Sequence, residues 1–283
     1  MKYSLMIKIA IVTGTVFLLN SPSAETLDTV LASQSGEVQS RYVSRHPKET
    51  LEFFGVQPGM MVIEAFPGGG WYSNILVPLL GSEGQLIGAD YAFDMYPKFN
   101  FYPEDFLAAK KTWGKTWTEG LLRRHGNNQA RVGAFALGSM TDDIDGKVDV
   151  VILIRALHNL ARFESDGGYL TTALKEIYRA LKPGGAVGVV QHLAPEDTSD
   201  EWANGSNGYL KKSFVVKTMS DAGFELVGAS EANVNPADQP VEGDIVWRLP
   251  PALATSREDP ELRASLERIG ESTRMTLLFR KGT

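Results

Sequence analysis

V-I-E-A-F-P-G-G-G-W-Y-S, residues Val62 to Ser73, is the stretch that decides the fold. We expect a short buried strand over residues 60–63 that stops at Glu64, and an apolar helix over residues 71–80. Between them lie a proline and three glycines. Glycine allows a turn that a Cβ would block and lets a ligand lie against bare backbone at the helix N-terminus. A strand, a glycine-rich turn and a helix form the nucleotide-binding part of an open α/β sheet.

Further strands follow at the spacing of such a sheet. Asp90 ends an apolar run over residues 84–90 and lies 26 residues after Glu64, the distance a βαβ unit needs to return a parallel strand. The β-branched run 147–154 is typical of a parallel strand covered on both faces. We expect the other strands over 131–137, 186–191, 223–228 and 275–280, and helices over 48–54, 103–125, 168–181 and 212–222. Lys182–Gly185 is expected to be only a turn.

The first 24 residues are predicted to be a signal peptide. Lys2 and Lys8 precede an apolar run over residues 9–19, and small residues follow it. That run is too short to span a hydrocarbon core of about 30 Å. Cleavage after Ser23 or after Ala24 remains open, and a retained membrane anchor or a plain folded helix are the alternatives. We therefore expect an exported protein, periplasmic or secreted, with no stable membrane anchor after cleavage.

The remaining residues, 25–283, are predicted to form one α/β domain. The chain has 43% hydrophobic and 22% charged residues, which is ordinary for a globular protein with one substantial core. Residues 232–272 form a long insertion before the last strand, which suggests a lid or flap. Within it, Asp259 and Pro260 are expected to begin a short helix that Gly270 ends.

Charge and composition exclude several function classes. The formal net charge is −6, so the chain gains no attraction to phosphate backbones, and we expect no nucleic-acid partner. The basic residues near Lys110 and Arg124 are predicted to form a solvated helix face. The chain has no cysteine, which excludes disulfides and thiolate catalysis. The four histidines lack metal-ligand spacing, and no P-loop or nucleophile-elbow motif occurs.

In order and spacing, these motifs resemble the class I S-adenosylmethionine-dependent methyltransferases over about residues 45–283. The resemblance rests on E-A-F-P-G-G-G, on the acid Asp90, on V-D-V-V-I-L-I followed by R-A-L-H-N-L, and on L-K-P-G-G and A-G-F-E-L-V. With its leader, the chain looks like the exported methyltransferase-like proteins of bacteria. The resemblance implies a doubly wound, mostly parallel seven-stranded sheet with a terminal antiparallel strand, and S-adenosylmethionine as cofactor.

The resemblance also implies roles for particular residues. Asp90 would accept hydrogen bonds from both ribose hydroxyls. The methionine part of the cofactor would lie against four residues of the glycine-rich turn: Glu64, Gly68, Gly69 and Gly70. Next to the adenine and the transfer site would lie Ser139, Met140, Arg155 and Leu157.

Two positions depart from the family's pattern. Phe66 stands where the family usually has its first glycine, and Ser139 replaces an acid that commonly meets the adenine amino group. The first change narrows the turn, and the second loses a charge-assisted contact. Weak binding, or a changed ligand, is therefore open.

Methyl transfer needs in-line alignment and, for a protonated acceptor, a base. His158 and His192 follow strand ends and are the catalytic candidates, with a structural role as the alternative for each. The expected reaction is methylation of an unknown small molecule or protein group. A non-catalytic binding protein with the same fold is the first alternative. An NAD-dependent oxidoreductase is the second, although Ser73 stands where G-x-G-x-x-G requires its last glycine.

Overall fold

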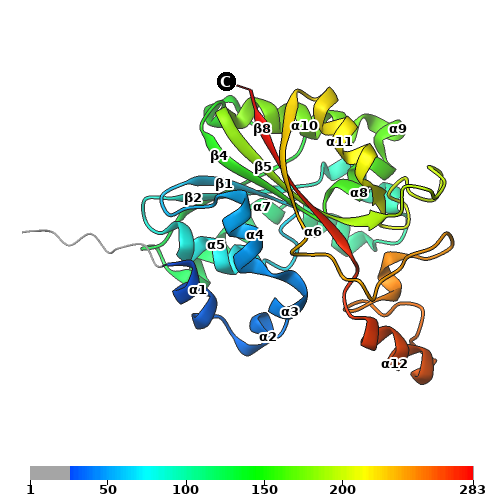
Figure 1. Cartoon of the computed structure of the whole chain (residues 1–283). Helices are drawn as coiled ribbons and strands as arrows, with labels where there is room; N and C mark the ends of the chain where they lie inside the picture. The colour runs from blue at the N-terminus through cyan, green and yellow to red at the C-terminus, as the bar shows by residue number, and fades with distance from the viewer. Residues whose placement is uncertain (1–25, 283) are drawn as a thin grey trace, which may run out of the picture.

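The computed structural model describes residues 26–282, so the predicted signal peptide lies outside the described residues. Their centre is a sheet in the order β3-β2-β1-β4-β5-β8-β7, with β6 beside β5 (Figure 1). The strands are β1 (Met61–Ala65), β2 (Gln85–Asp90), β3 (Arg131–Ala136), β4 (Val148–Ile154), β5 (Leu181–Ala194), β6 (Leu210–Lys211), β7 (Phe224–Ser230) and β8 (Arg274–Lys281). Strands β1 to β5 run parallel, and β8 is antiparallel to β5 and β7. The predicted doubly wound sheet with a terminal antiparallel strand is confirmed.

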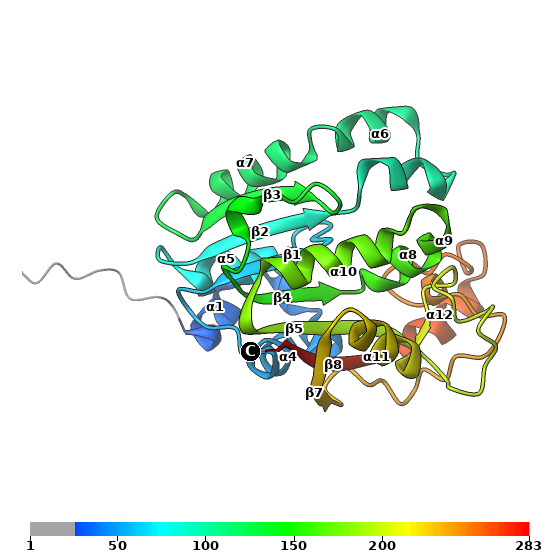
Figure 2. The same ribbon diagram turned by 90° about the horizontal axis from the view of Figure 1, so that it is seen from above.

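Helices cover both faces of the sheet, as Figure 2 shows. Helices α4, α5 and α7 pack on one face, and α8, α10 and α11 pack on the other. Successive residues of β4 alternate between these two cores: Val150 and Ile152 join the first, and Val151 and Leu153 the second. The helices are α1 (Leu27–Ser33), α2 (Gly36–Gln39), α3 (Tyr42–Arg45), α4 (Pro47–Phe54), α5 (Ser73–Leu80), α6 (Glu104–Lys110), α7 (Trp113–His125), α8 (Leu157–Arg162), α9 (Glu164–Gly167), α10 (Tyr169–Ala180), α11 (Lys212–Asp221) and α12 (Pro260–Ile269), with 3-10 turns η1 (Phe93–Phe99), η2 (Asp142–Ile144) and η3 (Val246–Arg248).

Local structure differs from the sequence-based expectation in three places. The helix predicted over 103–125 is two helices, α6 and α7, because the chain breaks at Lys111 and Thr112. Lys182–Gly185 is part of β5, which has a register shift against β4 between Val148 and Val150 and a positive φ of 74° at Gly184. Strand β1 runs through Glu64 to Ala65 instead of stopping at Glu64.

Helix α4 matches the helix predicted over 48–54: Pro47 occupies its first turn and Gly55 caps its end. It lies over interior strands of the sheet and not at its edge. A Cβ on Gly188 of β5 would come within 2.3 Å of the Phe54 ring, so this glycine permits a close approach of helix to sheet.

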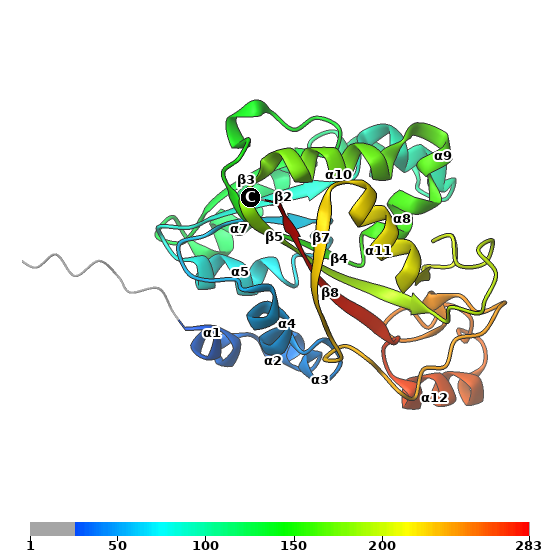
Figure 3. The same ribbon diagram turned by 45° about the horizontal axis from the view of Figure 1, so that its top comes forward.

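The segment between β7 and β8 carries α12, which Asp259 caps by accepting from the Leu262 amide. Figure 3 shows this segment beyond the arrowhead of β5. In the part of the chain that the structure describes, no helix has the length and apolarity needed to cross a membrane.

Candidate functional site

A cavity of about 1590 Å³ lies at the carboxyl ends of β1, β4 and β5. Ligands of open α/β sheets bind at this edge, and a volume above about 1000 Å³ leaves room for more than one small molecule. The turn after β1, the start of α8, the segment 33–45 and the segment 245–257 border the cavity, together with residues of α5, of β5 and of the segments 99–102 and 124–129. The 232–272 insertion therefore contributes directly to the wall of the cavity.

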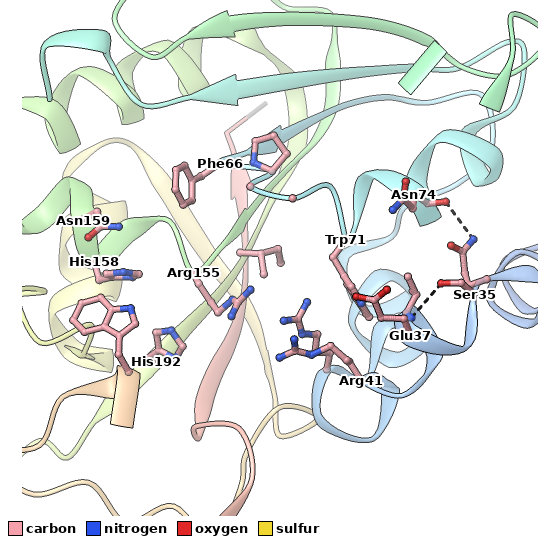
Figure 4. Close-up of a pocket in the computed structure, with 18 of the residues that line it drawn as sticks. Ser35, Glu37, Arg41, Phe66, Trp71, Asn74, Arg155, His158, Asn159 and His192 are labelled. Carbon is pink, nitrogen blue, oxygen red and sulfur yellow. Dashed lines mark hydrogen bonds between the residues drawn. The ribbon is translucent and has the colours of Figure 1, made fainter. Parts of the chain in front are cut away.

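The residues that directly follow β1 and β4 adopt left-handed backbone conformations. Phe66 has a φ of 53° and Arg155 a φ of 56°, a region that costs a non-glycine residue roughly 1–2 kcal/mol. Each backbone N–H still bonds the neighbouring strand, Phe66 to the Ala89 carbonyl at 2.6 Å and Arg155 to the Val190 carbonyl at 2.7 Å. The chain then turns sharply and places both side chains against the cavity (Figure 4).

The turn after β1 presents bare backbone to the cavity. Gly68 and Gly69 line it, whereas Gly70 is buried beneath them. A Cβ on Gly69 would meet no atom within 4 Å, so the space beside it is open. Gly68 has a φ of 55°, which favours glycine.

Glu64 lies one layer deeper and does not line the cavity. Its carboxylate is 3% exposed and accepts a 2.6 Å hydrogen bond from the Ser73 hydroxyl at the start of α5. Burial raises the pKa of Glu64 to about 7, and the bonds from Ser73 oppose that rise. In this geometry the residue ties β1 to α5.

Asp90 is where the sequence places it, at the end of β2, but its carboxylate is already occupied. The Lys110 ammonium donates to Oδ2 at 2.7 Å, the Tyr96 hydroxyl to Oδ1 at 2.5 Å, and the Tyr91 backbone N–H to Oδ1 at 3.0 Å. Lys110 also lies 4.3 Å from the centre of the Tyr96 ring. The predicted solvated helix face is therefore wrong for Lys110, whose side chain is 14% exposed.

Ser139 and Met140 do not border the cavity. The Ser139 hydroxyl donates to the Ala136 carbonyl, and Met140 is 7% exposed within the core. The Glu176 carboxylate accepts hydrogen bonds from the Gly138 and Met140 backbone N–H groups. The predicted adenine contacts are thus satisfied within the protein.

The two candidate catalytic histidines lie side by side at the cavity wall. The rings of His158 and His192 are 5.7 Å apart between centroids, and both residues are less than 8% exposed. Nδ1 of His158 lies 3.3 Å from the Gln191 amide oxygen, and Nδ1 of His192 lies 2.6 Å from the Ser272 hydroxyl. Burial lowers the pKa of His158 to about 4 and that of His192 well below its usual range. Both imidazoles are neutral at pH 7.

Except for Arg155, the arginines around the cavity belong to none of the sequence motifs. Six arginines line it, against one acidic side chain among the described lining residues, Glu37. They are Arg41, Arg45, Arg124, Arg155, Arg162 and Arg257. In Figure 4, Arg155 and the histidines point into the cavity from one side and Arg41 faces them from the other. These arginines come from five separate segments, so no local motif announces them.

Glu271 holds part of this arginine cluster in place. It accepts from Arg41 and Arg45 through Oε1, and its Oε2 lies 3.4 Å from Arg274. Burial alone would raise the pKa of Glu271, but Arg45, Arg274 and Arg41 together lower it. Arg45 also stacks on Trp71, with its guanidinium carbon 4.7 Å from the ring centre.

Part of the sequence matches a known family, and the fold as a whole resembles solved structures. A family model described as "Methyltransferase domain" matches residues 114–189. None of the curated proteins matches the sequence significantly.

Three solved structures resemble the chain. A geranyl diphosphate methyltransferase in complex with S-adenosylmethionine is 14% identical, with coverage of 90% of this chain and 94% of that one and a TM-score of 0.53. A putative sarcosine dimethylglycine methyltransferase from Galdieria sulphuraria is 14% identical, with coverage of 88% and 90% and a TM-score of 0.51. The cyclase SpnF is 15% identical, with coverage of 85% and 82% and a TM-score of 0.52. The chain thus has the Rossmann-like fold of the class I methyltransferases, and its residues 114–189 match the methyltransferase domain.

Proposed function

We propose that the protein is a methyltransferase that uses S-adenosylmethionine. The fold and the match of residues 114–189 to a methyltransferase domain support methyl transfer and this cofactor. One observation carries the proposal: the bare backbone of Gly68 and Gly69 borders the same cavity as Arg155 and the two histidines. When bound, the cofactor supplies an activated methyl group. The chain's own task is then alignment and exclusion of water.

The residues present fit the cofactor at its methionine end. Gly68 and Gly69 leave open space at the turn, and the cavity beside them is large enough for a nucleoside and an acceptor together. At the ribose end the acid is present, but Lys110 and Tyr96 hold it. Asp90 can therefore serve a ribose only when Lys110 moves away.

His158 is our candidate for the base that takes a proton from the acceptor. It is neutral at pH 7 and borders the cavity, and Gln191 orients its Nδ1. Its lowered pKa makes it a weak base, which is sufficient for an acceptor that ionises readily. His192, held by Ser272, is the second candidate.

A non-catalytic binding protein is the second candidate function, and a specific observation favours it. Asp90, the expected ribose acceptor, and the backbone N–H groups of Gly138 and Met140 already have hydrogen-bond partners among the chain's own side chains. A protein with these contacts closed permanently would keep the fold and bind something else in the cavity.

Calorimetry with S-adenosylmethionine, S-adenosylhomocysteine and NAD in parallel tests these functions. We expect the first two ligands to bind, and Asp90→Asn to weaken both at least about tenfold because the ribose loses a charged acceptor. Failure of both to bind the wild type would contradict the proposal. Incubation with an extract and methyl-labelled donor then tests turnover: labelling that His158→Gln slows without changing cofactor affinity supports the base. Binding without labelling favours the non-catalytic function.

We also propose that the chain is exported, with its acceptor a small molecule or an exposed protein group. This rests on the sequence of residues 1–24. A reporter fused after residue 30 should be exported and cleaved. A reporter that stays uncleaved in the cytoplasm would refute the assignment.

A further inference from the structure

The cavity has a surplus of positive charge that its protein contacts do not neutralise. Glu271 is the carboxylate that pairs with Arg41, Arg45 and Arg274. Arg155 adds a fourth guanidinium to the same group. Burial is the largest cause that lowers the pKa of Arg155, and the nearby charge of Arg274 lowers it further. The group therefore holds three more positive charges than negative ones. This occurs in a chain whose formal net charge is −6.

Arg155 lacks a partner for its side chain. Within residues 26–282 its guanidinium makes no hydrogen bond and no ion pair, although its backbone N–H bonds Val190. Figure 4 shows it pointing into the middle of the cavity. The backbone at Arg155 is held in the left-handed region to place it there. A guanidinium presents five donors in a planar fork that suits carboxylates and phosphates.

The methyl donor does not match this charge. S-adenosylmethionine carries a sulfonium and an ammonium against one carboxylate, so it is a net cation. Its carboxylate can satisfy one guanidinium, but its binding adds positive charge to a cavity that already has a surplus. Negative charge on a second molecule would therefore balance the surplus in the filled cavity.

We propose that the cavity binds an anionic methyl acceptor, a small molecule with phosphate or carboxylate groups, and that Arg155 is its main contact. That the anion is a methyl acceptor rests on the proposed methyl transfer, whereas the anion site itself rests on the arginines. Arg41 faces Arg155 across the cavity (Figure 4), and Arg45, Arg162 and Arg257 also line it. This arrangement suits a ligand with more than one negative charge.

Calorimetry with pyrophosphate and with citrate tests the site. We expect both anions to bind the wild-type protein, and Arg155→Gln to weaken them at least tenfold. The matched control is Arg268→Gln, which removes the same charge from an exposed position on α12 away from the cavity and should change affinity less than twofold. Arg155→Lys keeps the charge and loses the fork, so it should fall between. Affinity for the wild type should also drop as sodium chloride is raised.

Absence of binding by both anions, or equal binding to wild type and Arg155→Gln, would overturn the proposal. The same titrations at saturating S-adenosylhomocysteine show whether the arginines bind a separate acceptor or the carboxylate of the methyl donor. Undiminished binding places the anion beside the cofactor, as an acceptor requires. Competition would assign the arginines to the donor's carboxylate and refute the acceptor. If S-adenosylhomocysteine binds and the anions do not, this inference fails and the proposed function stands; the opposite result leaves the anion site and removes methyl transfer.

Discussion

Replacing Lys110 with methionine should both destabilise the protein and open the ribose position. The Lys110–Asp90 pair is 2.7 Å long with side chains only 14% and 5% exposed. Methionine keeps most of the side-chain volume among the surrounding aromatic rings but leaves the buried carboxylate without its cation. Removing one partner of a buried pair costs roughly 3–5 kcal/mol. Because Tyr96 and the Tyr91 amide still donate to Asp90, we expect the lower end, about 3 kcal/mol.

Urea unfolding at pH 7 measures this loss, with Lys217→Met as the matched control. Lys217 pairs with Asp221 at 2.5 Å, but these side chains are 75% and 64% exposed. Such exposed pairs are worth at most about 1 kcal/mol. Combining Lys110→Met with Asp90→Asn should cost less than the sum of the two single changes, with a coupling of about 2 kcal/mol. Equal losses for the buried and exposed lysines, or additive single changes, would refute the reasoning.

The same variant has a consequence for the ligand. In the wild type, S-adenosylhomocysteine must displace Lys110 before its ribose reaches Asp90. If that release costs about 1.4 kcal/mol, Lys110→Met should bind the ligand about tenfold more tightly. Calorimetry on wild type and variant decides this, and unchanged or weaker binding by a folded variant would show that Lys110 does not guard the site.

Changes at four further positions test other parts of the structure. Phe66→Gly should have a free energy of unfolding about 1 kcal/mol higher than Phe66→Ala, because both lose the ring but only alanine keeps the left-handed strain. Urea unfolding measures the difference, and equal midpoints would contradict it. Gly188→Ala should destabilise the protein by about 1–3 kcal/mol, because its Cβ would meet the Phe54 ring. Gly69→Ala should stay within about 0.5 kcal/mol of the wild-type stability but weaken the binding of S-adenosylhomocysteine. Urea unfolding measures both stabilities, and calorimetry measures the binding. Glu64 has a folded pKa of about 7, above its ordinary value of 4.5, so the folded state holds the extra proton and its contribution to stability is lost as pH rises from about 4.5 through 7. From pH 5 to pH 8 the wild type should lose about 2–3 kcal/mol relative to Glu64→Gln, measured by urea unfolding; a constant difference would mean that Glu64 does not titrate there.

The strands and the glycine turn could be predicted from the sequence because both depend on local patterns. The β-branched run of β4 marks a strand covered on both faces, and the acid at the end of β2 marks the carboxyl end of that strand. The predicted boundaries of α4 and α12 are confirmed because proline at the first turn and glycine at the end are local signals. The helical break before α7 was missed because it serves two distant contacts: Lys110 reaches Asp90, and Trp117 packs beside Gly88.

The chemistry of the cavity was harder to predict because it depends on residues far apart in the chain. Gly68, Gly69, Arg155 and the two histidines line the cavity, as a strand-end argument suggests. The state of Asp90 could not be read from its position, since Lys110 lies 20 residues away on another element. The arginine surplus has no sequence signal either, because a net charge of −6 conceals a local excess of the opposite sign.

The position of Glu271 has a consequence for how the protein is made. Its bonds to Arg41 and Arg45 join residues 230 and 226 positions apart, and β8, which follows it, inserts between β5 and β7. Contacts of such long sequence separation form late and slow folding. Arg41 and Arg45, which line the cavity, cannot pair with Glu271 before that residue has left the ribosome, so this wall of the cavity is completed late. A chain carried unfolded across a membrane would reach its destination empty and would depend on the ligands it met there.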